Sequence, residues 1–164
     1  KVMVMGKKIG YGVIGYGGMG HFHGRRCQSI DMLDFIGFYD IDPEVQKKGA
    51  EEGAHSFASR AELLADERID LVTVATPNDV HKEIVIDALR AGKNVICEKP
   101  VEMSVASLDR MIAAANESGK LFTVHQNRRW DVDFLAVKQL AESGEIGKEN
   151  ITCEANNGMW KSVG

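Results

Sequence analysis

Three glycines are the first residues whose spacing indicates chemistry. Gly15, Gly17 and Gly20 form the pattern G-x-G-x-x-G after a short apolar run that begins at Ile9. In such a turn between a strand and a helix, the first glycine permits a tight turn and the second lets the backbone approach a pyrophosphate. The third lets the helix pack closely on the strand, and the helix N-terminus offers N–H groups to the phosphates. The pattern predicts dinucleotide binding, but alone it also fits an ordinary tight turn, so its context decides.

An aspartate provides the first supporting context. Asp40 ends the apolar run 35–39, about 20 residues beyond the glycines, where an acidic side chain hydrogen-bonds the ribose of NAD. Asp42 is better explained as a helix cap, because Pro43 suits the first helical position. No lysine or arginine follows before Lys47, so a 2′-phosphate would meet carboxylates. We therefore expect NAD rather than NADP; the alternative for Asp40 is a simple turn residue.

A charged pair followed by a proline provides further context. Glu98, Lys99 and Pro100 come directly after the apolar run 95–97. One interpretation is a loop with a solvated ion pair. The other places Lys99 in a cleft beside the cofactor, where burial lowers the pKa of an amine and makes it a usable proton carrier. These residues alone leave both interpretations open.

Alternating strands and helices are expected to bring these residues to one place. The expected strands span 8–15, 35–39, 55–58, 69–75, 94–97 and 121–124, and the expected helices span 18–30, 43–52, 59–64, 79–90 and 104–118. This alternation predicts an α/β fold with a doubly wound parallel sheet. Right-handed crossovers put the loops that follow the strands along one edge, where such sheets bind ligands.

Composition restricts the class of protein. With 164 residues the chain is long enough for one domain with a substantial core. The net charge of −4 and the lack of a basic stripe argue against nucleic acid as a partner. The apolar runs are only as long as a strand, which argues against a membrane span. The apolar part of residues 1–8 is too short for a secretory signal. Cys27, Cys97 and Cys153 are far apart and odd in number, which favours reduced thiols in a cytoplasmic protein.

Taken together, the motifs resemble the glucose–fructose oxidoreductase and inositol dehydrogenase family, Gfo/Idh/MocA. The segments that carry the resemblance are, in family order, G-Y-G-G-M-G, F-Y-D, A-T-P-N-D-V-H, E-K-P and H-Q-N-R-R-W-D. The resemblance implies an NAD-binding Rossmann domain over 1–128. Residues 129–164 would then hold the linker helix and first strand of a truncated substrate domain. It also implies an oxidoreductase that transfers hydride between nicotinamide and a hydroxyl-bearing carbon of a sugar, cyclic polyol or related small molecule.

The resemblance also implies roles for particular residues. Lys99 is the expected catalytic residue, which hydrogen-bonds the reacting hydroxyl, and a cis Lys99–Pro100 bond is expected. The expected cofactor-binding residues are Gly15, Tyr16, Gly17, Gly18, Met19, Gly20, Asp40, Thr76, Pro77, Asn78, His81, Glu98, Lys99 and Asn127. The family's aspartate and histidine, four apart on a helix of the second domain, have no counterpart in this chain. Its catalytic set is therefore expected to be incomplete and the fragment inactive alone.

Other candidates and alternatives follow from the remaining residues. His23 and Cys27 could share a helix face with metal-binding spacing, but no further ligand completes a zinc set, so no metal is expected. Cys97 is expected to be a small buried strand residue. His125 could equally line the cleft or be a structural histidine.

The tail and the class of function leave further alternatives. The helix 131–143 and the strand 150–156 are expected to lack partners within the chain, which favours a homo-oligomer or poor order there. A non-catalytic dinucleotide-binding regulator or scaffold is the alternative function, and Lys99 favours the enzyme.

Overall fold

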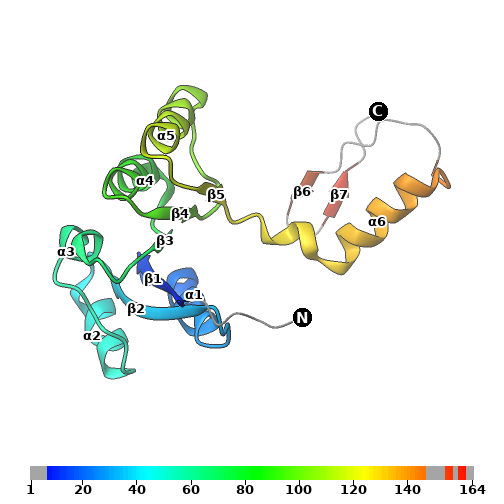
Figure 1. Ribbon diagram of the computed structural model, residues 1–164. Coiled ribbons are helices and arrows are strands. Elements are labelled where there is room, and N and C mark those ends of the chain that lie inside the picture. Colours follow the sequence, from blue (N-terminus) through cyan, green and yellow to red (C-terminus); the bar gives the residue numbers. More distant parts are fainter. Residues whose placement is uncertain (1–6, 147–153, 157–158, 162–164) are drawn as a thin grey trace. The chain divides into compact units, whose positions relative to one another are not determined.

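The computed structural model describes residues 7–146, 154–156 and 159–161 (Figure 1). The chain divides into two compact units, Lys1–His125 and Gln126–Gly164. None of the described helices is both long enough and apolar enough to cross a membrane.

The first unit is built on a five-stranded sheet. Its strands are β1 (Ile9–Ile14), β2 (Leu33–Tyr39), β3 (Leu71–Val74), β4 (Asn94–Cys97) and β5 (Phe122–Val124). They lie in the order β2-β1-β3-β4-β5, and every neighbouring pair is parallel. The expected doubly wound α/β sheet is confirmed. Since the chain passes from β1 to β2 on one side and later to β3 on the other, the topological switch point lies between β1 and β3, where such sheets bind ligands.

Several of the connecting helices begin or end at residues with recognisable caps. They are α1 (Gly18–Cys27), α2 (Pro43–Glu51), α3 (Arg60–Ala65), α4 (His81–Arg90) and α5 (Val105–Ser118). The Asp42 carboxylate accepts the Glu44 N–H at 2.9 Å, so the predicted N-cap is confirmed. The Ser59 hydroxyl caps α3 in the same way and accepts the Glu62 N–H at 3.1 Å. Gly119 has a φ of 64° and ends α5 in the left-handed conformation expected of it.

Two hydrophobic clusters hold the helices to the sheet. Along β1, Tyr11 and Val13 join a cluster with Phe38, whereas Ile14 belongs to a larger cluster that includes Val85 of α4. Successive side chains of a strand point to opposite faces, so the clusters cover the two faces of the sheet. α4 packs against both β4 and α5 (Figure 1). Each fully buried aliphatic side chain contributes roughly 1.5–3 kcal/mol to this packing.

Two predicted elements of the first unit differ from the structure. Residues 55–58 do not form a strand; Ser56 makes only an isolated parallel bridge to Phe38. Pairing stops there because the chain turns at once into the capped helix α3, whose N-cap is Ser59. The helix expected from residue 79 starts as a 3-10 turn, η1 (Asn78–Val80), and becomes α-helical at His81.

The second unit contains η2 (Asn127–Trp130), α6 (Val132–Ser143), β6 (Glu154–Asn156) and β7 (Met159–Lys161). The prediction that its strand lacks a neighbour within the chain is wrong, because β6 pairs antiparallel with β7. Antiparallel strands need only a short connection, so a hairpin forms where a single strand was expected. Residues 150–153 of the predicted strand lie outside the described residues. α6 has no buried residue, and the homo-oligomer stays a prediction.

Candidate functional site

Two glycines of the turn after β1 are enclosed by the protein. Gly15 has a φ of 84°, and a Cβ there would lie 2.8 Å from the carbonyl carbon of Ala75. A Cβ on Gly20 would lie only 1.8 Å from the carbonyl oxygen of Gly15. These two positions therefore need glycine so that the turn can form and α1 can approach β1.

The middle of the same turn faces open space. Apart from the adjoining backbone, a Cβ added to Gly17 or Gly18 would meet no atom of the described residues within 4 Å, and Met19 is also exposed. Gly17 is the N-cap residue of α1, which has no side-chain cap and no acidic residue in its first turn. The first N–H groups of the helix are therefore left for a ligand, and the positive end of the helix dipole favours an anion. A dinucleotide pyrophosphate fits this arrangement.

Asp40 joins the end of β2 to the glycine turn. Its Oδ2 atom accepts the N–H of Tyr16 at 2.6 Å, and its Oδ1 atom accepts the N–H of Asp42 at 2.9 Å. An ionised carboxylate has about four acceptor positions, so both oxygens can still accept ribose hydroxyls. The bond to Tyr16 is a structural role that the sequence analysis missed. The Tyr16 ring is buried and stacks on Phe38 with centroids 3.8 Å apart, so only its backbone faces the turn.

The loop after β3 lies beside the glycine turn. Gly15 approaches Thr76, whose hydroxyl oxygen is buried and has no hydrogen-bond partner among the described residues. Pro77 is exposed and Asn78 half-buried. His81 is fully buried; its Nε2 donates to the Thr76 carbonyl at 2.8 Å, while its Nδ1 lies 3.3 Å from the Val101 carbonyl. The expected contribution of His81 to cofactor binding is therefore indirect, through the loop backbone.

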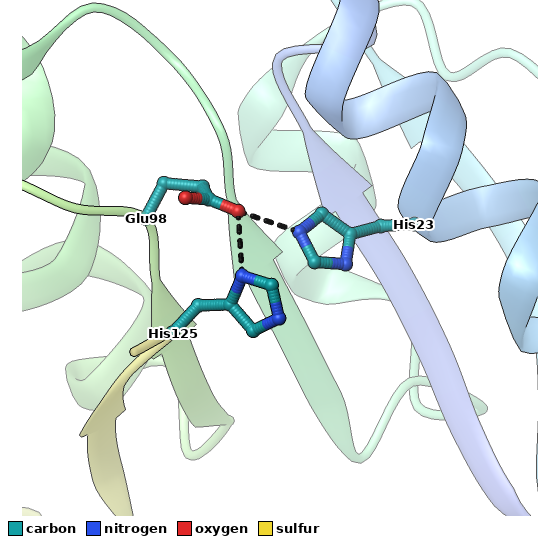
Figure 2. A group of neighbouring side chains, drawn as sticks. All are labelled: His23, Glu98 and His125. Atoms are coloured by element: carbon teal, nitrogen blue, oxygen red, sulfur yellow. Dashed lines mark hydrogen bonds and ion pairs between the residues drawn. The ribbon is translucent and has the colours of Figure 1, made fainter. Parts of the chain in front are cut away.

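At the ends of β4 and β5, two histidines converge on one carboxylate (Figure 2). His23 Nε2 lies 2.7 Å and His125 Nδ1 lies 2.9 Å from the same Oε1 atom of Glu98. The other oxygen, Oε2, accepts the backbone N–H of Lys99 at 3.2 Å. Glu98 is 5% exposed, and the two imidazole rings meet edge to face at 4.6 Å. This arrangement, the Glu98 cluster, joins α1 to the ends of two strands.

From the sequence, His23 was expected only not to bind a metal, and His125 either to line the cleft or to be structural. Because β4 and β5 are neighbouring parallel strands, the order of the strands would have placed His125 near Glu98. Nothing in the local sequence indicates that His23, on a helix 75 positions away from Glu98, reaches the same atom.

The electrostatics of the cluster favour an ionised Glu98. Burial raises the pKa of Glu98, but the hydrogen bond from His23, the Lys99 N–H and the electrostatic influence of the two histidines outweigh it and hold that pKa below its ordinary value. Burial also raises the pKa values of two neighbours, Tyr11 and Cys97, to about 12 each. Near neutral pH the site therefore contains one buried carboxylate, with a neutral phenol and a neutral thiol nearby.

Metal-binding atom types are also present in the Glu98 cluster. One atom from each of its three residues lies within 4.8 Å of the others. An ionised carboxylate only accepts hydrogen bonds, so each imidazole nitrogen that faces it carries a proton and has no lone pair for a metal. Hydrogen bonding accounts for the observed arrangement, and the absence of a metal stays a prediction.

Lys99 and Asn127 complete the predicted set. The Lys99 side chain is exposed, so the first unit does not supply the burial that the sequence analysis invoked for its amine. The Lys99–Pro100 peptide bond is cis, as the family resemblance implied. Asn127 belongs to η2 of the second unit, where it is exposed.

Comparison with known proteins gives a family match over most of the first unit. Residues 9–126 match the model described as "Oxidoreductase family, NAD-binding Rossmann fold", GFO_IDH_MocA. The chain is 32% identical over 145 residues to the myo-inositol 2-dehydrogenase of Thermotoga maritima, covering 85% of this chain and 42% of that protein. It is 34% identical over 145 residues to the scyllo-inositol 2-dehydrogenase (NADP+) IolW of Bacillus subtilis, covering 84% and 38%.

A solved structure agrees with this match. The NAD-binding protein of Listeria innocua superposes with a TM-score of 0.83 at 45% identity, covering 87% of this chain and 42% of that one. The chain therefore spans less than half the length of the relatives described here.

Proposed function

Because this chain belongs to the Gfo/Idh/MocA oxidoreductase family with an NAD-binding Rossmann fold, we propose that the full-length protein is a dehydrogenase. It transfers hydride between nicotinamide and a hydroxyl-bearing carbon of a sugar, cyclic polyol or related small molecule. The observation that carries the proposal is the uncapped N-terminus of α1 beneath the open Gly17 and Gly18, with the Asp40 carboxylate adjoining the same turn. Two inositol dehydrogenases among the relatives support this substrate class.

The charges around the glycine turn favour NAD over NADP. A hollow of about 190 Å³ beside the turn is lined by Gly17, Lys48 and Glu52, among others. Lys48 is the basic residue that could attract a 2′-phosphate, but Glu52 shares the hollow and interacts with it. Asp40 adds a second carboxylate at the turn. A 2′-phosphate would therefore meet the carboxylates of Asp40 and Glu52, whereas the ribose hydroxyls of NAD would find acceptors.

The residues of this chain would bind and orient the cofactor and carry the proton of the reacting hydroxyl. When bound, the nicotinamide supplies the hydride chemistry. The α1 N-terminus would hold the pyrophosphate and Asp40 the ribose. Lys99, at the carboxyl end of β4, would hydrogen-bond the reacting hydroxyl and carry its proton. The burial that would tune this amine would come from substrate and from parts of the protein outside the first unit.

The test is a dehydrogenase assay of the full-length protein with NAD on a panel of sugars and cyclic polyols. Lys99→Ala should lower kcat by roughly 100-fold or more, since general acid–base groups contribute about that much. The Kd for NAD should stay within about threefold, because the lysine serves the hydroxyl. Lys120→Ala is the matched control, since Lys120 is exposed and precedes β5 at the opposite end of the strand.

The outcomes separate the two classes of function. Unchanged turnover in the Lys99 variant would refute the role of the lysine. Tight NAD binding with no turnover of any compound on the panel would favour the alternative, a dinucleotide-binding regulator or scaffold.

A further inference from the structure

Glu98 accepts hydrogen bonds from three donors in different parts of the chain. Its three donors come from α1, from the residue after β5 and from the backbone of Lys99. Two of them share one oxygen, and the carboxylate is 5% exposed. The proposed chemistry at Lys99 and at the glycine turn makes no use of either histidine, so this cluster requires its own explanation.

Hydrogen-bond direction defines what each member does. An ionised carboxylate has no proton to give, so His23 must carry its proton on Nε2 and His125 must carry its proton on Nδ1. The two hydrogen bonds to Oε1 come from different directions and fix the orientation of the carboxylate plane. The Oε2 atom is then left aimed at the Lys99 N–H. The two imidazoles therefore orient the carboxylate, and the carboxylate in turn orients the Lys99 backbone.

We propose that His23, Glu98 and His125 form a clamp that positions Lys99 for the hydride-transfer reaction, a role that rests on the proposed function. Its members act through the Lys99 backbone, so they are positioning residues and not catalytic ones. The clamp also ties α1, whose N-terminus faces the pyrophosphate site, to the strand end that carries Lys99. A displacement of about 1 Å at a reacting group can cost roughly 100-fold in rate, so a carboxylate held from two sides is a suitable device for this task.

The donor position of each histidine allows a specific design. His23 donates from Nε2, and a glutamine places its amide N–H near that atom. His125 donates from Nδ1, and an asparagine does the same there. His23→Gln and His125→Asn therefore keep a donor without an imidazole, whereas His23→Ala and His125→Ala remove it. Arg26→Ala is the matched control, because Arg26 is exposed in the last turn of the same helix, away from the glycine turn.

The experiment measures turnover, NAD affinity and backbone exchange in the full-length protein. We expect the alanine variants to lose roughly 10- to 100-fold in kcat, with the Kd for NAD within about threefold, and the amide variants to recover most of the loss. Hydrogen exchange at the Lys99 amide should become faster in the alanine variants alone. Ring ¹⁵N shifts should show His23 protonated on Nε2 and His125 on Nδ1. Arg26→Ala should leave all these quantities unchanged, and thermal unfolding identifies any variant that has not folded.

Several results would overturn the clamp. Unchanged kcat and unchanged Lys99 exchange in both alanine variants would do so. Equal losses in the amide and alanine variants would assign the role to the imidazole itself, and so would a stoichiometric metal whose removal by chelator abolishes turnover. The exchange and ¹⁵N measurements need no substrate. If the full-length protein turns over no compound, the proposed function fails while these two readouts still decide whether the clamp exists.

Discussion

The carboxyl edge of the sheet has two halves that are built by different means. At β1 and β2 the site consists of backbone: enclosed glycines, open glycines and the N–H groups at the start of α1. At β4 and β5 it consists of side chains, in which two imidazoles surround a buried carboxylate next to Lys99. The backbone half tolerates no added atoms at Gly15 and Gly20. The side-chain half depends on donors that distant elements supply.

The difference shows where each half is vulnerable. Substitutions in the backbone half are expected to act sterically, on folding or on cofactor binding. Substitutions in the side-chain half are expected to leave the fold largely in place and to act on the orientation of a reacting group. The following changes test this distinction, from the largest expected effect to the smallest.

The largest effect is expected for Gly20→Ala. The new methyl would lie 1.8 Å from the Gly15 carbonyl oxygen, so α1 must move away from β1. We expect a loss of about 3 kcal/mol or more in the free energy of unfolding, at the upper end of the cost of overpacking. Chemical denaturation measures it.

Gly17→Ala is the matched control for this change. Beyond the neighbouring residues, its methyl meets no atom within 4 Å in the part of the chain that the structure describes, so stability should change little while NAD affinity falls. Equal destabilisation by the two substitutions would contradict the division of the turn into enclosed and open glycines.

A smaller effect is expected at the cofactor. Asp40→Ala removes the ribose acceptor and one negative charge beside the hollow that contains Lys48. The unmutated protein should bind NAD more tightly than NADP, and the variant should lose roughly tenfold of that preference, or about 1.4 kcal/mol. Calorimetry with both cofactors measures it. Asp40→Asn retains an acceptor for the Tyr16 N–H and removes only the charge. It therefore separates the effect of the charge on affinity from the effect of losing the hydrogen bond that holds the turn. Equal or tighter binding of NADP by the unmutated protein would refute the assignment.

The smallest effect is expected in the acid range. The pKa of Glu98 is lowered in the folded state, so its contribution to stability is present above the ordinary value of 4.5 and is lost as pH falls through the lower folded value. The difference in unfolding free energy between the wild type and Glu98→Gln should therefore shrink below about pH 4.5. Glu83→Gln, at an exposed glutamate paired with Arg60, is the control. A difference that is constant with pH would show that folding does not lower the pKa of Glu98.

How far the sequence could predict the structure varied along the chain. The cap at Asp42 and the turn at Gly15 depend on neighbouring residues alone, so they could be predicted. The strand expected at 55–58 did not form, because after a single bridge to Phe38 the chain turns at once into α3. The strand expected to be alone was found in a hairpin, because residues further along the chain supply the partner.

The same distinction holds for the functional residues. By itself the sequence determined the parallel α/β fold, the glycine turn and the acidic residue at the end of β2, because each follows from local backbone requirements and a regular spacing. Only the tertiary structure decided that the Tyr16 ring is buried against Phe38 and that His81 holds backbone carbonyls. It also brought His23 and His125 to one oxygen of Glu98. Those contacts join residues from separate elements, and their distances depend on how the helices pack on the sheet, which local sequence does not specify.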